Sequence, residues 1–147
     1  MLDKKFWNKV GPKIRDAYRT HIFHKGKDVN GKPFKRYSPK YGERKRAGLL
    51  RRQDSSSKNK RAPVVTTDLL RDFGTSYNTT SNQVKMGWSI YGKRVEALNK
   101  MGRLLTTKSN PLPKDTIKLF ESEAVKYIKK RLKDMFPKNM TIDLTKK

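Results

Sequence analysis

The chain has 147 residues and a formal net charge of +24, with 33% hydrophobic residues, 34% charged residues and no cysteine. Its length suits one domain with a modest core. The lack of cysteine excludes disulfides and thiolate chemistry, and no apolar run approaches membrane-spanning length, so we expect a soluble chain. So large a charge favours a polyanion, of which nucleic acid is the commonest, with an anionic membrane surface or an acidic protein as alternatives.

Residues 1–23 are predicted to form an amphipathic helix. Its apolar side chains recur at three- and four-residue steps: Leu2, Phe6, Val10, Ile14, Ala17 or Tyr18, and Ile22. Gly11-Pro12 predicts either a kink or the start of a second helix. His21 and His24 are interpreted as polar residues at the helix end, because no cysteine or acidic cluster lies nearby to complete a metal site.

Residues 24–63 are predicted to form a long basic arm or loop. Lysine and arginine far outnumber acids here, and glycines and prolines interrupt any regular element. The aromatic residues Phe34, Tyr37 and Tyr41 alternate with basic ones, a pattern that can stack on bases and bind phosphates. The alternative is a solvated loop whose aromatic side chains only anchor it to the domain.

Residues 64–102 are predicted to form a helical turn, a hairpin and a short helix. Thr75–Thr80 and Gln83–Ser89 are typical of strands on either side of a turn at Ser81-Asn82. The second strand alternates so that Val84, Met86 and Trp88 share one face. We expect this hairpin to be central and Trp88 to lie in or beside the core.

The C-terminal part continues with a loop at 103–113, an amphipathic helix at 114–136 and a polar tail at 137–147. The helix carries one apolar stripe: Ile117, Phe120, Ala124, Ile128, Leu132, and Met135 or Phe136. The complete pattern predicts a single α+β domain. In it, a small antiparallel sheet with a central hairpin packs against the N- and C-terminal amphipathic helices and carries a long basic loop.

A series of short motifs runs through this order. They are Asp28-Val29-Asn30-Gly31 before Pro33-Phe34, Val64-Val65-Thr66-Thr67-Asp68-Leu69-Leu70, Val84-Lys85-Met86-Gly87-Trp88, Asn99-Lys100-Met101-Gly102-Arg103 and Leu112-Pro113-Lys114-Asp115. The series resembles the phage tail-completion family of virion morphogenesis (head–tail joining) proteins. Asp68 stands where that family has glycine, and Asp115 stands where an arginine is common.

The resemblance implies a structural protein of the phage virion, located in the head–tail neck and assembled in the host cytoplasm. Such a protein forms a homo-oligomeric ring, sixfold or twelvefold, that joins the portal–adaptor complex to the tail around the DNA path. Its implied partners are copies of itself, portal, adaptor and tail proteins and, non-specifically, phage DNA, with no membrane. The alternative is a basic nucleic-acid-binding module, and a nuclease or other metal enzyme fits poorly.

No catalytic, cofactor or metal site is predicted, because the sequence has no nucleotide-binding glycine loop, no paired carboxylates in a motif and no Ser/His/Asp constellation. Within the basic arm we predict two groups of binding residues. Phe34, Tyr37 and Tyr41 would dock on a neighbouring subunit or ring. The cations predicted to face DNA or an acidic partner are Arg44, Lys45, Arg46, Arg51, Arg52, Lys58, Lys60 and Arg61.

Overall fold

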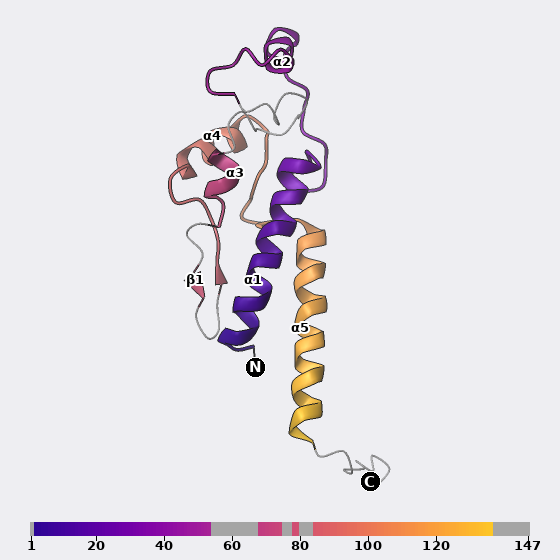
Figure 1. The fold of residues 1–147 in the computed structure, drawn as a ribbon. Helices are drawn as coiled ribbons and strands as arrows, with labels where there is room; N and C mark the ends of the chain where they lie inside the picture. Colours follow the sequence, from indigo (N-terminus) through magenta and orange to yellow (C-terminus); the bar gives the residue numbers. More distant parts are fainter. Residues whose placement is uncertain (1, 54–67, 75–77, 80–83, 137–147) are drawn as a thin grey trace.

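The computed structural model describes residues 2–53, 68–74, 78–79 and 84–136. Its elements, in chain order, are α1 (Lys4–Arg19), the π-helical turn η1 (Thr20–His24), α2 (Pro39–Arg46), α3 (Asp68–Asp72), β1 (Asn78–Thr79), β2 (Val84–Lys85), α4 (Gly92–Lys100) and α5 (Lys114–Met135). In Figure 1, α1 and α5 lie side by side, α3 and α4 lie on the other side of α1, and α2 stands apart at one end.

Helices α1 and α5 run antiparallel, held by aromatic packing and by polar contacts at each level. The Phe120 ring stacks on Trp7, with 5.6 Å between centroids, and Lys13 pairs with Glu123 at 2.9 Å. Asp3 caps α1 by accepting a hydrogen bond from the backbone N–H of Phe6. The same carboxylate accepts from the Tyr127 hydroxyl at 2.7 Å, so the cap also fixes α5.

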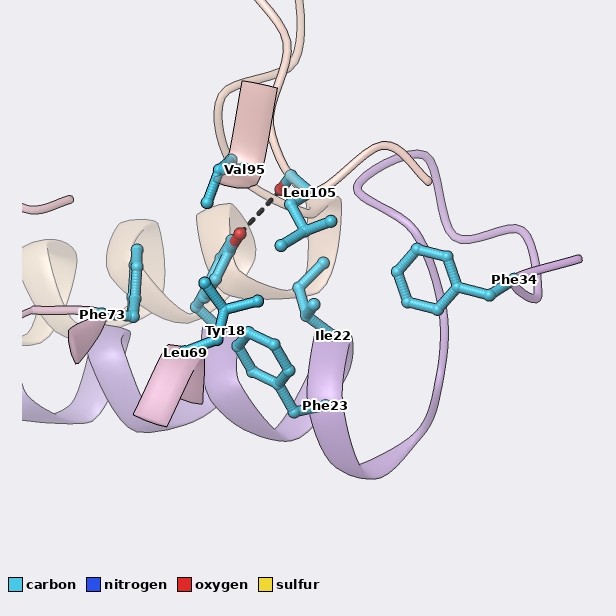
Figure 2. Close-up of a cluster of buried hydrophobic side chains, with 8 residues drawn as sticks. All are labelled: Tyr18, Ile22, Phe23, Phe34, Leu69, Phe73, Val95 and Leu105. Carbon is cyan, nitrogen blue, oxygen red and sulfur yellow. Dashed lines mark hydrogen bonds between the residues drawn. The ribbon is translucent and has the colours of Figure 1, made fainter. Parts of the chain in front are cut away.

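The core consists of two hydrophobic clusters along α1 and η1. The first is drawn in Figure 2 and contains Tyr18, Ile22, Phe23, Phe34, Leu69, Phe73, Val95 and Leu105. The second is built on Phe6, Val10 and Ile14, and the partly buried Met86 and Leu112 pack against both. Within the first cluster, the buried Tyr18 hydroxyl donates to the carbonyl oxygen of Leu105 at 2.7 Å. This bond ties the loop after α4 to α1.

His21 lies in the π-helical turn and links two distant loops. It is 7% exposed, with Nδ1 2.7 Å from a carboxylate oxygen of Asp115 and Nε2 3.0 Å from the carbonyl oxygen of Asp28. Both neighbours are acceptors, so both ring nitrogens can donate only when the imidazole carries two protons. Partial burial raises the pKa of Asp115, but the hydrogen bond and charge of His21 outweigh it, and the net effect lowers the pKa from its ordinary value of 3.8.

The prediction of an α+β fold with an antiparallel sheet is wrong. The described part of the chain is 59% helical and 5% strand. Within it, β1 and β2 pair over only two positions, Asn78 with Lys85 and Thr79 with Val84. A two-residue ladder offers no face for helices to cover, and the isolated antiparallel bridge between Phe73 and Trp88 does not widen it into a sheet. Met86 and Trp88 pack against the α1 clusters instead. Residues 75–77 and 80–83 of the predicted hairpin lie outside the described residues.

Helices α1, α4 and α5 lie where apolar periodicity predicts helices. Pro12 is inside α1 and does not end it. Residues 39–46, predicted as part of a loop, form α2 with Pro39 in its first turn, where the missing N–H costs no hydrogen bond. Trp88 is partly buried at the edge of the first cluster, and its indole N–H donates to the Leu69 carbonyl at 3.1 Å.

The His21–Asp115 contact leads to a prediction about pH. A carboxyl group whose pKa is lowered by folding stabilises the fold above its unfolded pKa, and this stabilisation is lost as pH falls through the folded pKa. Asp115→Asn keeps the side chain's shape, so at about pH 5 the variant should melt at a lower temperature than the parent. The deficit should disappear as the pH is lowered to about 2. Asp134→Asn, at the exposed end of α5, is the control. If the melting temperature of Asp115→Asn stays equally far below that of the parent at the lowest pH, the ionised Asp115 does not stabilise the fold through His21.

Candidate functional site

A broad basic cleft of about 1070 Å³ lies between the segment that leads into α2, the turn after α2, and helices α3 and α4. These elements occupy the same end of the molecule in Figure 1. The cleft is lined by three tyrosines, Tyr37, Tyr41 and Tyr91, by six cations and by one acid, Asp68. We call it the Tyr37 cleft, because that ring is in contact with side chains of α2 and of the segment after α4.

The Tyr37 ring is held by two cations and one aromatic ring. The Arg103 guanidinium lies 4.0 Å from its centroid, and the Lys45 ammonium lies 4.7 Å from it. The Tyr41 ring is tilted against it, also at 4.7 Å. Burial raises the pKa of Tyr37 to about 12, so the phenol stays neutral at physiological pH and its π face remains available to cations.

Arg103 is placed by the way in which α4 ends. Gly102 has φ +77°, a left-handed conformation that suits glycine, and the Arg103 N–H donates to the Leu98 carbonyl at 2.9 Å. The Asn99 side chain then accepts from the backbone N–H of Leu105 and donates to the carbonyl of Thr106. These contacts direct Arg103 inward, where it is 7% exposed and donates to the Lys35 carbonyl at 3.0 Å.

A tight turn after α2 forms another wall of the cleft. The Gln53 side chain accepts from the Leu50 N–H and donates to the Lys45 carbonyl. Arg52 has φ +54° and is the non-glycine residue with positive φ in the described structure. A left-handed arginine costs roughly 1–2 kcal/mol, and strain of this kind often accompanies a functional position.

Tyr91 is held at the cleft by a buried acid. Asp72 is 4% exposed, and its carboxylate accepts from the Ser89 hydroxyl and from the backbone N–H groups of Ile90 and Tyr91. The carboxylate therefore fixes the turn that leads into α4 with three hydrogen bonds. Arg94, one turn into α4, lies 5.3 Å from the Tyr91 ring.

The cleft cations fall into a buried one and an exposed set. Arg103 is engaged within the protein, as described above. The exposed set, which lines the cleft and forms no ion pair within the described residues, is Lys35, Arg36, Arg51, Arg52 and Arg94. Five exposed positive charges around one open cleft create a strong local field for an anion. The arginine guanidinium matches the geometry of a phosphate, and also that of a carboxylate.

The predicted binding residues occupy different environments. Arg51 and Arg52 line the cleft, as do Tyr37 and Tyr41, whereas Arg44 and Arg46 are exposed on α2. Lys45, predicted to face DNA, is 1% exposed and lies over Tyr37 instead. Phe34, predicted to dock on a neighbour, is 3% exposed in the protein's own core. Lys58, Lys60 and Arg61 lie outside the described residues.

The binding residues predicted from the sequence do not include four cations of the cleft, which are Lys35, Arg36, Arg94 and Arg103. Arg94 and Arg103 lie more than 30 residues beyond the predicted arm, so charge density along the chain could not have joined them to it. The available signal was the Asn99-to-Arg103 motif, because a helix that stops at glycine fixes the direction of the next side chain.

The described residues contain no group of three or more His, Cys, Asp or Glu side chains arranged to hold a metal ion. His21 is engaged by Asp115 and Asp28, and His24 is exposed. In the same part of the chain, no helix combines the length and the apolarity that crossing a bilayer requires.

Comparison of the chain with protein-family models, curated proteins and solved structures found no match. The resemblance to tail-completion proteins therefore stays a prediction from the motif order.

The stabilising role of Arg103 in the cleft can be tested by substitution. Arg103→Lys keeps the charge but loses the planar guanidinium that lies over Tyr37 and donates to the Lys35 carbonyl. The free energy of unfolding should therefore fall by about 1–3 kcal/mol. For Arg94→Lys, a matched change at an exposed cleft position, the free energy of unfolding should stay within about 0.5 kcal/mol of the parent value. Chemical denaturation measures both, and equal effects would mean that Arg103 does not organise the cleft.

Proposed function

We propose that this protein is a non-enzymatic structural component of the phage head–tail neck that holds the DNA backbone in the Tyr37 cleft. The observation that carries the DNA part is the cleft itself, with five exposed cations and one lining acid. An arrangement of this kind binds phosphates through charge and needs no particular base sequence. A protein that surrounds the genome path requires contact of this non-specific type.

The tyrosine rings of the cleft already have neighbouring side chains against them, which favours phosphates rather than bases as the bound group. Tyr37 already has Arg103, Lys45 and Tyr41 against its ring, and Tyr91 has Arg94 beside it. Base stacking needs an open aromatic face. The rings therefore serve to hold cations in position, and the exposed arginines and lysine provide the binding groups.

The motif order supports the neck as the setting. Several of its residues build the cleft: Asn99 and Gly102 direct Arg103, and Asp68 and Leu69 line it. Asp115, one of the two departures from the family pattern, faces His21 and lies 3.9 Å from Lys25. An arginine at this position would place a third basic group there, so an acid suits this chain.

A free-standing nucleic-acid-binding module is the second candidate, and the same cleft favours it. The two candidates share the DNA contact and differ in assembly, because a neck protein closes into a ring without DNA. Both are therefore tested by two measurements, one of DNA binding and one of oligomeric state.

Removing three exposed cleft cations should weaken DNA binding in a salt-dependent manner. We expect Arg51→Ala/Arg52→Gly/Arg94→Ala to reduce the slope of log Kd against log salt by about 2–3, since each phosphate contact on duplex DNA adds about 0.9. Glycine at position 52 suits the positive φ, so the variant should keep its fold. The matched control, Lys5→Ala/Lys9→Ala/Lys118→Ala, removes the same charge from exposed positions of α1 and α5.

Fluorescence anisotropy with a labelled duplex measures these slopes. If the control loses as much as the cleft variant, the cleft is not the binding site. If the parent does not bind the duplex at all, the DNA part of the proposal is wrong.

Oligomeric state tests the neck setting. Light scattering at moderate salt, without DNA, should give the mass of a closed ring. The cleft variant should form the same ring, because we assign its three cations to DNA contact and not to the subunit interface. A monomer that assembles only when DNA is added would support the free-standing module and contradict the neck protein.

A further inference from the structure

The second half of α5 exposes four apolar side chains, of which Ile128, Leu132 and Met135 belong to the stripe that the sequence pattern predicts to be buried. Val125 is 50% exposed, Ile128 42%, Leu132 47% and Met135 71%. They lie three, four and three residues apart, so they form one seam along the helix. We call these four residues the α5 seam.

The α5 seam is distinct from the face of α5 that packs on α1. That face consists of Phe120, Ala124 and Tyr127, which belong to the second hydrophobic cluster, followed by Arg131, which pairs with Asp3 at 3.0 Å. Asp3 caps α1, so the face has no further partner from α1 after Arg131. Figure 1 shows the end of α5 continuing past the N-terminal end of α1.

The spacing of the α5 seam suits a partner helix. A three–four–three repeat of apolar residues, with branched side chains at the first three positions, matches two consecutive a and d pairs of a coiled coil. The positions that flank such a seam decide which partner is accepted. Here Lys129 and Arg131 occupy them, and Lys126, Lys130 and Lys133 lie farther round the helix against one acid, Asp134.

We propose that the α5 seam is the docking site for an acidic amphipathic helix of a partner protein. Leucine-like side chains of that helix would pack between Ile128 and Leu132, and its glutamates would face Lys129. A second copy of this chain would instead place lysine and arginine opposite lysine and arginine, which costs affinity. This proposal does not depend on the DNA contact, because the α5 seam and the Tyr37 cleft share no residue.

The test uses the full chain and a labelled synthetic peptide of three heptads, with Leu at a and d and Glu at e and g. A second peptide of identical composition, with the heptad order scrambled, controls for simple attraction to a basic protein. We expect the heptad peptide to bind at least about tenfold more tightly than the scrambled one, a difference of about 1.4 kcal/mol. Ile128→Ser/Leu132→Ser should remove that preference. Leu49→Ser/Ile90→Ser, which changes two exposed apolar residues outside α5, should retain it.

Several results would overturn the proposal. Equal binding of the two peptides would mean that charge attraction alone accounts for the binding. A fall in oligomer mass for Ile128→Ser/Leu132→Ser would assign the α5 seam to a second copy. A heptad preference that appears only after residues 137–147 are deleted would assign it to the chain's own tail. Capture by anionic phosphatidylserine vesicles without peptide preference, lost in Ile128→Ser/Leu132→Ser, would assign it to a lipid surface. The Arg51→Ala/Arg52→Gly/Arg94→Ala variant should keep its peptide preference, so failure here and failure of the DNA proposal remain separate.

Discussion

The packing face of α1, continued by the π-helical turn, is the constraint on which the rest of this structure depends. It supplies buried side chains to both hydrophobic clusters, from Phe6 at one end to Phe23 at the other. The polar groups at its C-terminal end then hold loops that carry no regular structure. Tyr18 holds the carbonyl of Leu105, Arg19 holds the last carbonyls around α3, and His21 holds that of Asp28. These attachments hold the chain segments that neighbour Lys35, Leu69 and Arg103, three residues that line the Tyr37 cleft.

The protein accommodates its positive charge by giving several cations a specific acceptor. Arg103 and Lys45 are buried, and both lie over Tyr37, while Arg19 donates to two backbone carbonyls. A π face or a carbonyl oxygen offers negative potential without adding an acid that would cancel the external field. The exposed cations of the cleft therefore keep their full attraction for an anion, while the buried ones stabilise the walls.

Helices could be predicted from the sequence, because a stripe at 3.6-residue spacing has few other uses in a short chain. The sheet could not, because alternation at Val84, Met86 and Trp88 fits any extended segment that lies on a hydrophobic surface. Here the surface is α1, so Met86 and Trp88 pack on a helix. The cleft was partly predicted, through Tyr37, Arg51 and Arg52. The burial of Lys45 could not be predicted, because the α2 sequence has no apolar stripe that marks a buried face. The His21–Asp115 contact could not be predicted either, because the two residues lie 94 positions apart in the sequence.

The exposed α5 seam has the same origin as the successful helix prediction. The pattern along 114–136 predicts a buried stripe for the whole helix, but the Arg131–Asp3 pair marks the level at which α1 begins. Leu132 and Met135 come after that level, while Val125 and Ile128 come before it on a face of α5 outside the second hydrophobic cluster. All four side chains can be buried only by something outside this helix pair. Because α5 begins at His21, near the cleft, and ends beyond Asp3, the two candidate surfaces lie at opposite ends of one rigid pair of helices. A protein built this way can hold a polyanion at one end and a partner at the other without either contact disturbing the core between them.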